Sequence, residues 1–299
     1  MREKRSNLQQ RNRTFGVLLL LPSVVFIFAF FAYPVCYSVY LSFTNTNLFL
    51  PSIEQKFIGL RNYIQLFKDP DFIDSIRTTF IFVFGATIIK IIVGILLALL
   101  YQQEIRGFGI FRSIIVIPMM ITPICAGLIM KVFLQPGFGV MNYLIGFFGI
   151  PRIGWYAEVS TALMSVMISD LWMMIPFVIV VAMSGFASLP EEVFEAADID
   201  GASWWTKLIK ITLPMMKPII AVIILINLID GFKVFDNVYI MTKGGPAHAT
   251  ELFTIFAYKE AIKMGKLGYG ATASLIVLFI ILIISFIFVK VSGAEEEFK

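Results

Sequence analysis

The sequence predicts an all-α integral membrane protein with about six transmembrane helices and a polar helix between the fourth and the fifth. Of its 299 residues, 59% are hydrophobic and only 15% are charged. A soluble domain of this size carries about a quarter charged residues. Six apolar runs are each long enough to cross a bilayer, which takes about 20 helical residues. The net charge of +4 is ordinary for a membrane protein and gives no indication of a nucleic-acid partner.

The predicted spans follow one another without a linker or an internal repeat. They cover residues 15–37, 79–101, 114–134, 162–186, 215–235 and 271–289. Prolines occur in the third and fourth spans, which membrane helices tolerate because neighbouring helices or water satisfy the freed carbonyl groups. We therefore expect one transmembrane domain over residues 15–291, between an N-terminal tail of residues 1–14 and a C-terminal tail of residues 292–299.

The basic N-terminal tail predicts the orientation in the membrane. Lys and Arg near the ends of spans favour the cytoplasmic side. The tail contains Arg2, Lys4, Arg5, Arg11 and Arg13. The first apolar run is long and no small-residue cleavage site follows it, so an uncleaved span fits better than a signal peptide. With an even number of spans, both termini are expected in the cytoplasm.

The residue types that catalysis or metal binding requires are scarce. His248 is the single histidine and is expected to be a solvated loop residue, while Cys36 and Cys125 lie in apolar runs. Histidine-based triads, zinc motifs and a disulfide framework are therefore excluded. No lysine precedes Ser or Thr, which excludes a phosphate-binding P-loop. We expect no enzyme, no bound metal and no cofactor in this chain, so its energy must come from an ion gradient or another chain.

The longest polar segment, residues 189–210, is predicted to form one helix. Ser188 and Glu191 match a capping box, and Pro190 suits the first turn. Acidic residues fill the first half and lysines follow in the second half. This order suits the helix dipole, whose positive end is at the N-terminus.

The small residues of this helix leave its role open between two interpretations. Gly201 in mid-helix costs about 1 kcal/mol relative to alanine, which favours a bend or a close contact there. In one interpretation the helix lies on the membrane, with Trp204 and Trp205 as interfacial anchors. In the other it docks on a second protein. Its acidic first half disfavours contact with the anionic inner leaflet.

The same segment resembles the EAA signature of permease subunits of ABC importers. The matching positions are Glu195, Ala196, Ala197, Gly201, Ile211, Leu213 and Pro214. The resemblance implies a coupling helix, here residues 189–212, that sits in a cleft of a cytoplasmic ATPase subunit. It assigns contacts with that subunit to Glu195, Ala196, Ala197, Asp200, Gly201, Ala202, Leu213 and Pro214.

Three further stretches are similar to the carbohydrate branch of this family, the maltose and glycerol-phosphate type permeases. They are LLPSVVFIFAFFAYPVCYSVYLSF, FIGLRNYIQLFKDPDF and GFKVFDNVYIMTKGGPAHATE. The resemblance implies a non-catalytic subunit that forms half of a sugar pathway in a bacterial or archaeal plasma membrane. Its implied partners are a second permease subunit, a pair of ATPase subunits that bind ATP and magnesium, and an extracytoplasmic sugar-binding protein.

Polar residues inside spans are expensive and are therefore candidates for the substrate pathway. Asp170 and Trp172 occupy the place where the maltose permease has Asn-x-Trp, although Trp172 suits simple packing equally well. Asn227, Asp230 and Lys233 lie near one face of the fifth span, where Asp230 and Lys233 are also spaced to pair with each other.

Lys90 lies about 11 residues, or ~16 Å, from the end of its span, too far to reach water easily. We expect an acidic partner on the second permease. Lys90 and Lys233 also raise the hypothesis of an anionic substrate.

An ion-coupled secondary transporter of a small polar solute is the alternative function. It fits the composition and the charges inside the spans, but it gives no reason for the EAA segment. The sequence does not name the sugar.

Overall fold

The computed structural model describes residues 15, 19–50, 54–101 and 108–292, which fold into helices joined by turns. Within this part of the chain the only β-type pairing is an isolated bridge between Thr44 and Phe57. The predicted N-terminal tail lies outside the described residues, as does the C-terminal tail beyond residue 292. The chain divides into two compact units, residues 1–68 with 259–276 and residues 69–258 with 277–299.

The first unit joins the beginning of the chain to the start of its last helix. Its elements are η1 (Phe28–Ala32), α2 (Tyr33–Ser42), α3 (Arg61–Leu66), η4 (Lys259–Lys263) and the first part of α15 (Leu267–Ser292). The Asn62 side chain donates to the carbonyls of Ser42 (2.8 Å) and Thr44 (2.9 Å). A Cβ at Gly268 would lie 2.2 Å from the Thr44 oxygen, so only glycine fits there. These contacts fix the end of α2 against α3 and α15.

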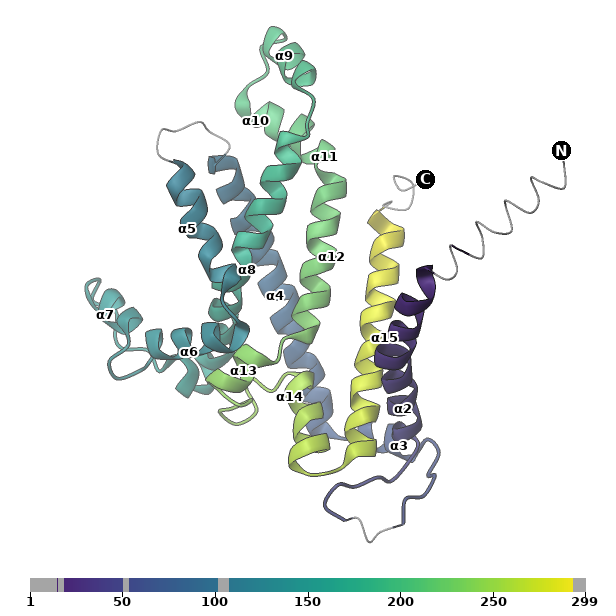
Figure 1. The fold of residues 1–299 in the computed structure, drawn as a ribbon. Helices are drawn as coiled ribbons and strands as arrows, with labels where there is room; N and C mark the ends of the chain where they lie inside the picture. Colours follow the sequence, from purple (N-terminus) through teal and green to yellow (C-terminus); the bar gives the residue numbers. More distant parts are fainter. Residues whose placement is uncertain (1–14, 16–18, 51–53, 102–107, 293–299) are drawn as a thin grey trace, which may run out of the picture. The chain divides into compact units, whose positions relative to one another are not determined.

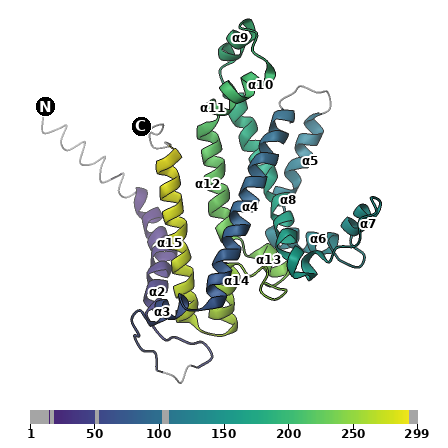
Figure 2. The same ribbon diagram turned by 180° about the vertical axis from the view of Figure 1, so that it is seen from behind.

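The second unit contains most of the helices. They are α4 (Pro70–Tyr101), α5 (Phe108–Met120), α6 (Pro123–Phe133), α7 (Val140–Gly146), η2 (Trp155–Ala157), α8 (Val159–Ala187), α9 (Glu191–Ile199), α10 (Trp204–Lys207), η3 (Leu208–Thr212), α11 (Leu213–Met215), α12 (Lys217–Lys233), α13 (Asp236–Met241) and α14 (Phe253–Tyr258). α4 and α8 run in the same direction and α12 runs in the opposite one (Figures 1 and 2).

Glycines allow the three long helices of this unit to approach closely. A Cβ at Gly94 of α4 would lie 2.5 Å from Val178 of α8. At Gly231 of α12 it would lie 3.2 Å from Val83 of α4. In a bilayer the hydrophobic effect does not drive helices together. Small residues favour helix association there because they let the backbones pack tightly. A buried cluster that includes Phe82 and Phe232 continues this contact.

Within the described residues, four helices are long and apolar enough to cross a membrane, and there are up to six spans if each of two bent helix pairs is counted as one. The straight candidates are Leu19–Ser42, Pro70–Tyr101, Val159–Ala187 and Leu267–Lys290. The number of spans agrees with the prediction, and the all-α fold class is confirmed. The third predicted span, however, is bent within its length, whereas α12 covers nearly all of the fifth and the bend lies at its start, at Met216.

Prolines explain both bends. The third predicted span breaks by 107° between Met120 and Pro123. Thr122 is extended there (φ −64°, ψ 144°), as a residue before proline prefers. The helix that leads into the fifth predicted span meets α12 at a 65° bend at Met216, two residues before Pro218 in the first turn of α12. A proline cannot donate to the preceding turn, so the helix is interrupted where the ring begins.

Candidate functional site

The polar segment after α8 forms two short helices instead of the single helix predicted. α9 ends at Ile199 and α10 begins at Trp204. The predicted capping box is also wrong, because Pro190 is the N-cap of α9. Ser188 is the C-cap of α8, and its hydroxyl donates to the carbonyl of Gly185 (2.7 Å). Its side chain therefore satisfies the end of the preceding helix rather than the start of α9.

Gly201 produces the break between α9 and α10. Its φ angle is +71°, a left-handed conformation that glycine adopts without a Cβ penalty. The N–H of Ala202 donates to Ala197 (2.9 Å) and that of Gly201 to Asp198 (3.0 Å), which is the Schellman pattern. A Cβ at Gly201 would meet no atom within 4 Å. Gly201 therefore lies just after the end of α9 and not in the middle of a helix. Within this chain, the left-handed backbone conformation favours glycine at this position, and a close contact does not.

Local contacts hold the turn between α9 and α10 in shape. The Lys207 ammonium lies 2.6 Å from the Asp198 carboxylate. The Ser203 hydroxyl accepts from the N–H of Thr206 (3.2 Å) and caps α10, a feature that the Ser-x-x-Thr spacing could have revealed. A pocket of about 180 Å³ lies between this segment and the end of α4; its lining is Leu99, Phe194, Trp204, Lys207, Leu208 and Thr212.

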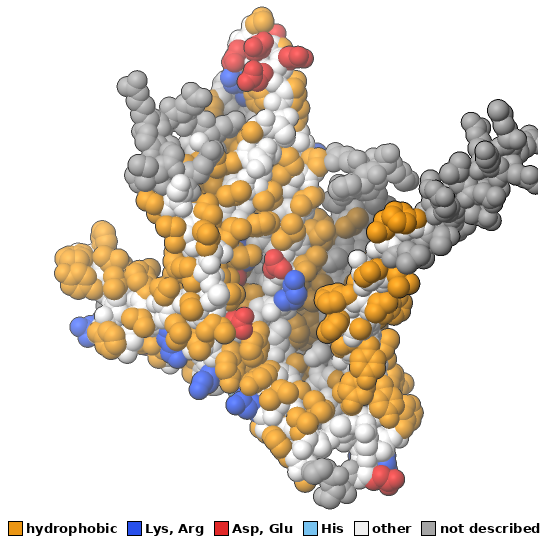
Figure 3. All heavy atoms as spheres, in the orientation of Figure 1, with side chains coloured by type: hydrophobic (Ala, Val, Ile, Leu, Met, Phe, Trp, Pro, Cys, Tyr) orange, Lys and Arg blue, Asp and Glu red, His pale blue; other side chains and the backbone are white. Residues whose placement is uncertain are grey.

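Most of the signature residues lie on an exposed tip of the second unit, and Leu213 and Pro214 lie in α11. Within the described residues, Glu195, Ala196, Asp200, Gly201 and Pro214 are exposed, Ala202 and Leu213 are half-buried, and Ala197 is buried. Ile199 is 88% exposed at the end of α9, which is unusual for an isoleucine in a short polar helix. Figure 3 shows the acidic side chains gathered at this end of the unit, where Figure 1 places α9. The tip therefore presents both negative charge and an apolar side chain.

Lys90 of α4 and Asp170 of α8 form a buried ion pair. The ammonium lies 2.6 Å from Oδ2, and the two side chains are only 1% and 2% exposed. The geometry is that of a charge contact rather than an aligned hydrogen bond, because Oδ2 has no hydrogen-bond partner. The predicted partner on a second subunit is therefore wrong: Lys90 pairs within its own chain. Sequence reasoning treated the two charges separately, although one cation and one anion within two spans are a signal for pairing.

Further buried polar groups lie close to the level of this pair. Thr87 Oγ1, Ser169 Oγ and Asn227 Oδ1 have no hydrogen-bond partner in the part of the chain that is described. Gly231 of α12 faces Val83 of α4. The two helices are antiparallel, so one turn back along α12 to Asn227 corresponds to one turn forward along α4 to Thr87. Asn227 also donates to a carbonyl of its own helix (2.9 Å). A polar layer thus crosses α4, α8 and α12.

Asp230 and Lys233 lie on an accessible face of α12. Their charged groups are 2.9 Å apart, and the side chains are 40% and 60% exposed. The sequence-based expectation that they pair with each other is confirmed. Trp172 is half-buried and packs against the larger hydrophobic cluster, which favours a packing role. Among the five pathway candidates, Asp170 and Asn227 are buried, and the pair on α12 is open.

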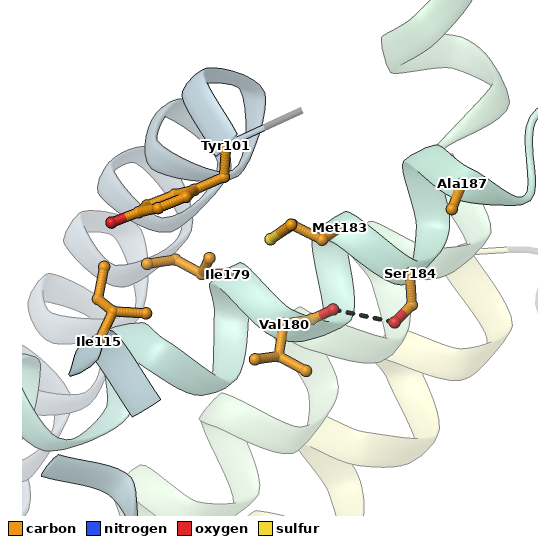
Figure 4. A pocket seen from close by; sticks show the side chains of 7 residues that line it. All are labelled: Tyr101, Ile115, Ile179, Val180, Met183, Ser184 and Ala187. Carbon is orange, nitrogen blue, oxygen red and sulfur yellow. Dashed lines mark hydrogen bonds between the residues drawn. The ribbon is translucent and has the colours of Figure 1, made fainter. Parts of the chain in front are cut away.

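The apolar pocket in Figure 4 lies elsewhere, at the end of α4, α5 and α8. It has a volume of about 320 Å³ and is lined by Tyr101, Ile115, Ile179, Val180, Met183, Ser184 and Ala187. The Ser184 hydroxyl donates to the Val180 carbonyl of its own helix (3.0 Å). This lining is poor in polar groups that would hold sugar hydroxyls, so we do not assign the pocket to the substrate pathway.

The residues after α12 form a compact turn packed on α6. Lys131 of α6 donates to the carbonyl of Ile240 in α13 (2.9 Å). A Cβ at Gly127 would lie 3.3 Å from the backbone of Asn237, so α6 and α13 touch closely. The sequence did not reveal this contact, because it joins residues more than a hundred positions apart.

Titratable groups near this turn give no catalytic arrangement. His248 is exposed, as predicted, and pairs with the buried carboxylate of Glu251. Burial raises the pKa of the Tyr156 hydroxyl. Among the described residues, no three His, Cys, Asp or Glu side chains come together as metal ligands.

Comparison with known proteins places the chain in a family. Residues 72–292 match the model of the binding-protein-dependent transport system inner membrane component. The chain is 29% identical over 292 residues to the trehalose/maltose transport system permease protein MalF of Thermococcus litoralis, covering 98% of each chain. It is 30% identical over 290 residues to the trehalose transport system permease protein SugA of Mycobacterium tuberculosis, covering 97% of this chain and 92% of that one.

The fold agrees with this relationship. A chain in the crystal structure of a bacterial ABC transporter for import of the acidic polysaccharide alginate has a TM-score of 0.82 and 21% identity, covering 97% of this chain and 98% of that one. A chain in the crystal structure of a bacterial alginate ABC transporter in complex with an alginate pentasaccharide-bound periplasmic protein gives a TM-score of 0.81, also at 21% identity, covering 94% of this chain and 95% of that one. The chain therefore belongs to the binding-protein-dependent transport system inner membrane components and is a permease subunit of the carbohydrate ABC transporter type.

Proposed function

We propose that this permease subunit is coupled to a cytoplasmic ATPase subunit through the tip formed by α9, Gly201 and α10. The observation that supports the proposal is the bare tip itself, on which acidic signature residues surround the exposed Ile199. A rigid turn fixed by the Schellman motif transmits force better than a frayed loop. An apolar side chain in a charged rim is also how protein interfaces are commonly built.

The partners follow from this coupling. ATP and magnesium belong to the ATPase pair, and this chain makes no catalytic contribution. A second permease subunit completes the pathway, and an extracytoplasmic binding protein delivers the sugar, as a periplasmic protein does for alginate in the related transporter. The basic residues at the start of the chain favour a cytoplasmic N-terminus, which places α9 and the C-terminus in the cytoplasm as well.

The sugar pathway is assigned to the accessible face of α12. Asp230 and Lys233 offer an acceptor and a donor to sugar hydroxyls, and their exposure leaves them free to do so. Asp170 and Asn227 act in packing, and Trp172 borders the core. Lys233 has Asp230 as a partner on this face, and Lys90 has Asp170 as a partner in the interior, so neither lysine leaves an unpaired positive charge. We therefore favour a neutral carbohydrate over the anionic substrate suggested by the lysines alone.

The same pairing argues against an ion-coupled transporter. Such a protein needs a carboxylate in its spans that is free to take up a proton or a cation. Asp170 has Lys90 as a partner at 2.6 Å, and Asp230 has Lys233 as a partner at 2.9 Å. Coupling to ATP through another chain requires no such group.

Charge reversal at the tip tests the proposal. Glu195→Lys in the complete transporter should weaken retention of the ATPase subunit by about tenfold or more, because like charges across an interface cost several kcal/mol and each 1.4 kcal/mol is tenfold. Glu54→Lys makes the same charge change at an exposed site of the first unit and should have no effect.

Gly201 provides a second, independent test of the tip. Gly201→Val should uncouple uptake from ATP hydrolysis, whereas Gly201→Asn should retain most coupling, since asparagine tolerates the left-handed conformation. ATPase co-purification and ATP-dependent uptake in vesicles are the measurements. Uptake without the ATPase, or normal coupling in Glu195→Lys, would disprove the proposal.

A further inference from the structure

The segment between α6 and α8 has a bare apolar surface that the transport proposal does not use. α7 packs Met141 and Ile145 against the larger hydrophobic cluster. On the opposite side lie Tyr143 and the C-cap Phe147, whose rings are 4.8 Å apart, and the next residue, Phe148, is 83% exposed. Figure 3 shows the hydrophobic side chains gathered over α7. The exposed members of this aromatic segment are Phe138, Val140, Tyr143, Leu144, Phe147, Phe148 and Ile150.

The aromatic segment turns its polar groups inward. The Asn142 amide donates to the carbonyls of Pro136 and Ile153, both at 2.9 Å. Its oxygen accepts from the N–H of Ile153 (3.2 Å) and the indole N–H of Trp155 (2.8 Å). The side-chain oxygen of Gln135 likewise accepts from the backbone N–H of Phe138. Irregular backbone can lie beside hydrocarbon only if its polar groups are satisfied internally, and this loop meets that condition.

The charge of the segment suits a phosphate-bearing surface. The sequence contains no Asp or Glu from Ile105 to Ala157. Arg152 is exposed at the end of the aromatic segment. Aromatic side chains beside a cation match the boundary between lipid acyl chains and headgroups, where such rings are enriched.

The direction of the chain places the segment at that boundary. α5 forms one arm of a bent span, and α6 leaves it at 107°. Figures 1 and 2 agree that α6 runs across the direction of α4 and α8 rather than along it, near the start of α8, while α4 begins beyond it beside α14. The aromatic segment thus continues directly from a membrane helix and stays near the level at which α8 begins.

We propose that the aromatic segment is an interfacial anchor that lies in the lipid boundary at the end of the unit where α4 and α8 begin. Tyr143, Phe147 and Phe148 enter the acyl region to a depth of about 5–10 Å, as amphipathic interfacial elements do. Arg152 contacts lipid phosphates. This anchor holds the α6–α13 contact at a fixed depth while the long helices move, and it does not depend on the proposed ATPase coupling.

Lipid quenching in the assembled transporter tests the anchor. Cys36 and Cys125 are replaced by serine, and a fluorophore is attached to Phe148→Cys or Phe147→Cys. The complete transporter is then placed in phosphatidylethanolamine–phosphatidylglycerol vesicles that contain nitroxide lipids. We expect the strongest quenching from a nitroxide near the top of the acyl chain and weaker quenching from one near its end.

The control is the same label at Glu54→Cys, an exposed polar position of the first unit, which should respond to aqueous iodide instead. Labels at Phe147 and Phe148 that iodide quenches and lipid nitroxides do not would overturn the anchor. Labels shielded from both quenchers would equally overturn it, because a protein partner would then cover the segment. Both results leave the ATPase proposal untouched.

Discussion

Two lysine–carboxylate pairs in the second unit have nearly the same contact distance and very different surroundings. Lys90 and Asp170 are 2.6 Å apart and almost fully buried, and they connect two helices. Lys233 and Asp230 are 2.9 Å apart, half exposed, and lie on one helix. The contact geometry alone would assign both the same role.

Burial gives the two pairs different consequences. A buried pair has lost its hydration, so either partner alone would be left as an uncompensated charge, which costs about 3–5 kcal/mol. An exposed pair exchanges with water and contributes about 0–1 kcal/mol. The first pair can therefore hold α4 against α8, and the second remains available to a passing solute.

The largest effect is expected from breaking the buried pair on one side. Lys90→Met leaves Asp170 charged and without a partner, and should lower the free energy of unfolding by about 3–5 kcal/mol. Thermal unfolding and the yield of folded transporter in detergent measure this. A loss below about 1 kcal/mol would show that the pair is solvated in the assembled protein.

Replacing both partners should recover most of that loss. Lys90→Met combined with Asp170→Leu removes both charges and keeps the volume, and such replacements are often neutral or stabilising. A double-mutant cycle measures the coupling between the two sites. The KM for sugar should stay unchanged. A stable double variant with a raised KM would instead place Asp170 in contact with the substrate.

The smallest effect on stability is expected at the exposed pair, together with the clearest effect on uptake. Asp230→Ala and Lys233→Ala should each change the free energy of unfolding by less than about 1 kcal/mol. Each should raise the KM for sugar by about tenfold, since a hydrogen bond to a charged group contributes about 1.5–3 kcal/mol. Initial uptake rates over a range of sugar concentrations test this.

The pair Glu54 and Lys56 is a matched control for this prediction. It is also exposed, with its charges 3.3 Å apart, but it belongs to the first unit. Alanine at either position should leave the KM for sugar unchanged. An equal KM effect at both pairs would argue against a pathway on α12.

Features that depend on neighbours along the chain were well predicted. The number of apolar segments and the pairing of Asp230 with Lys233 follow from spacing that any helix converts into contact. The prolines did not reveal the bends, because Pro176 lies inside the unbroken α8 while the chain bends next to Pro123 and Pro218. The polar segment was predicted as one helix with a bend or a close contact at Gly201, and the structure ends the first helix just before this residue, which is in a left-handed conformation.

Features that depend on distant residues were not predicted. Lys90 was assigned a partner on another subunit, and the close approach of Gly127 to Asn237 was not anticipated. Helical periodicity tells which residues share a face. It does not tell which helix that face meets.

The sequence by itself determined the membrane class, the approximate span count and the presence of a polar segment between the fourth and fifth apolar runs. These depend on hydropathy and on local spacing, which act over one or two helical turns. Only the tertiary structure decided which charges are satisfied internally and which are open to solute. Burial is a property of packed helices, and an ion pair changes from a solvated surface contact to a structural connection when neighbouring helices exclude water from it.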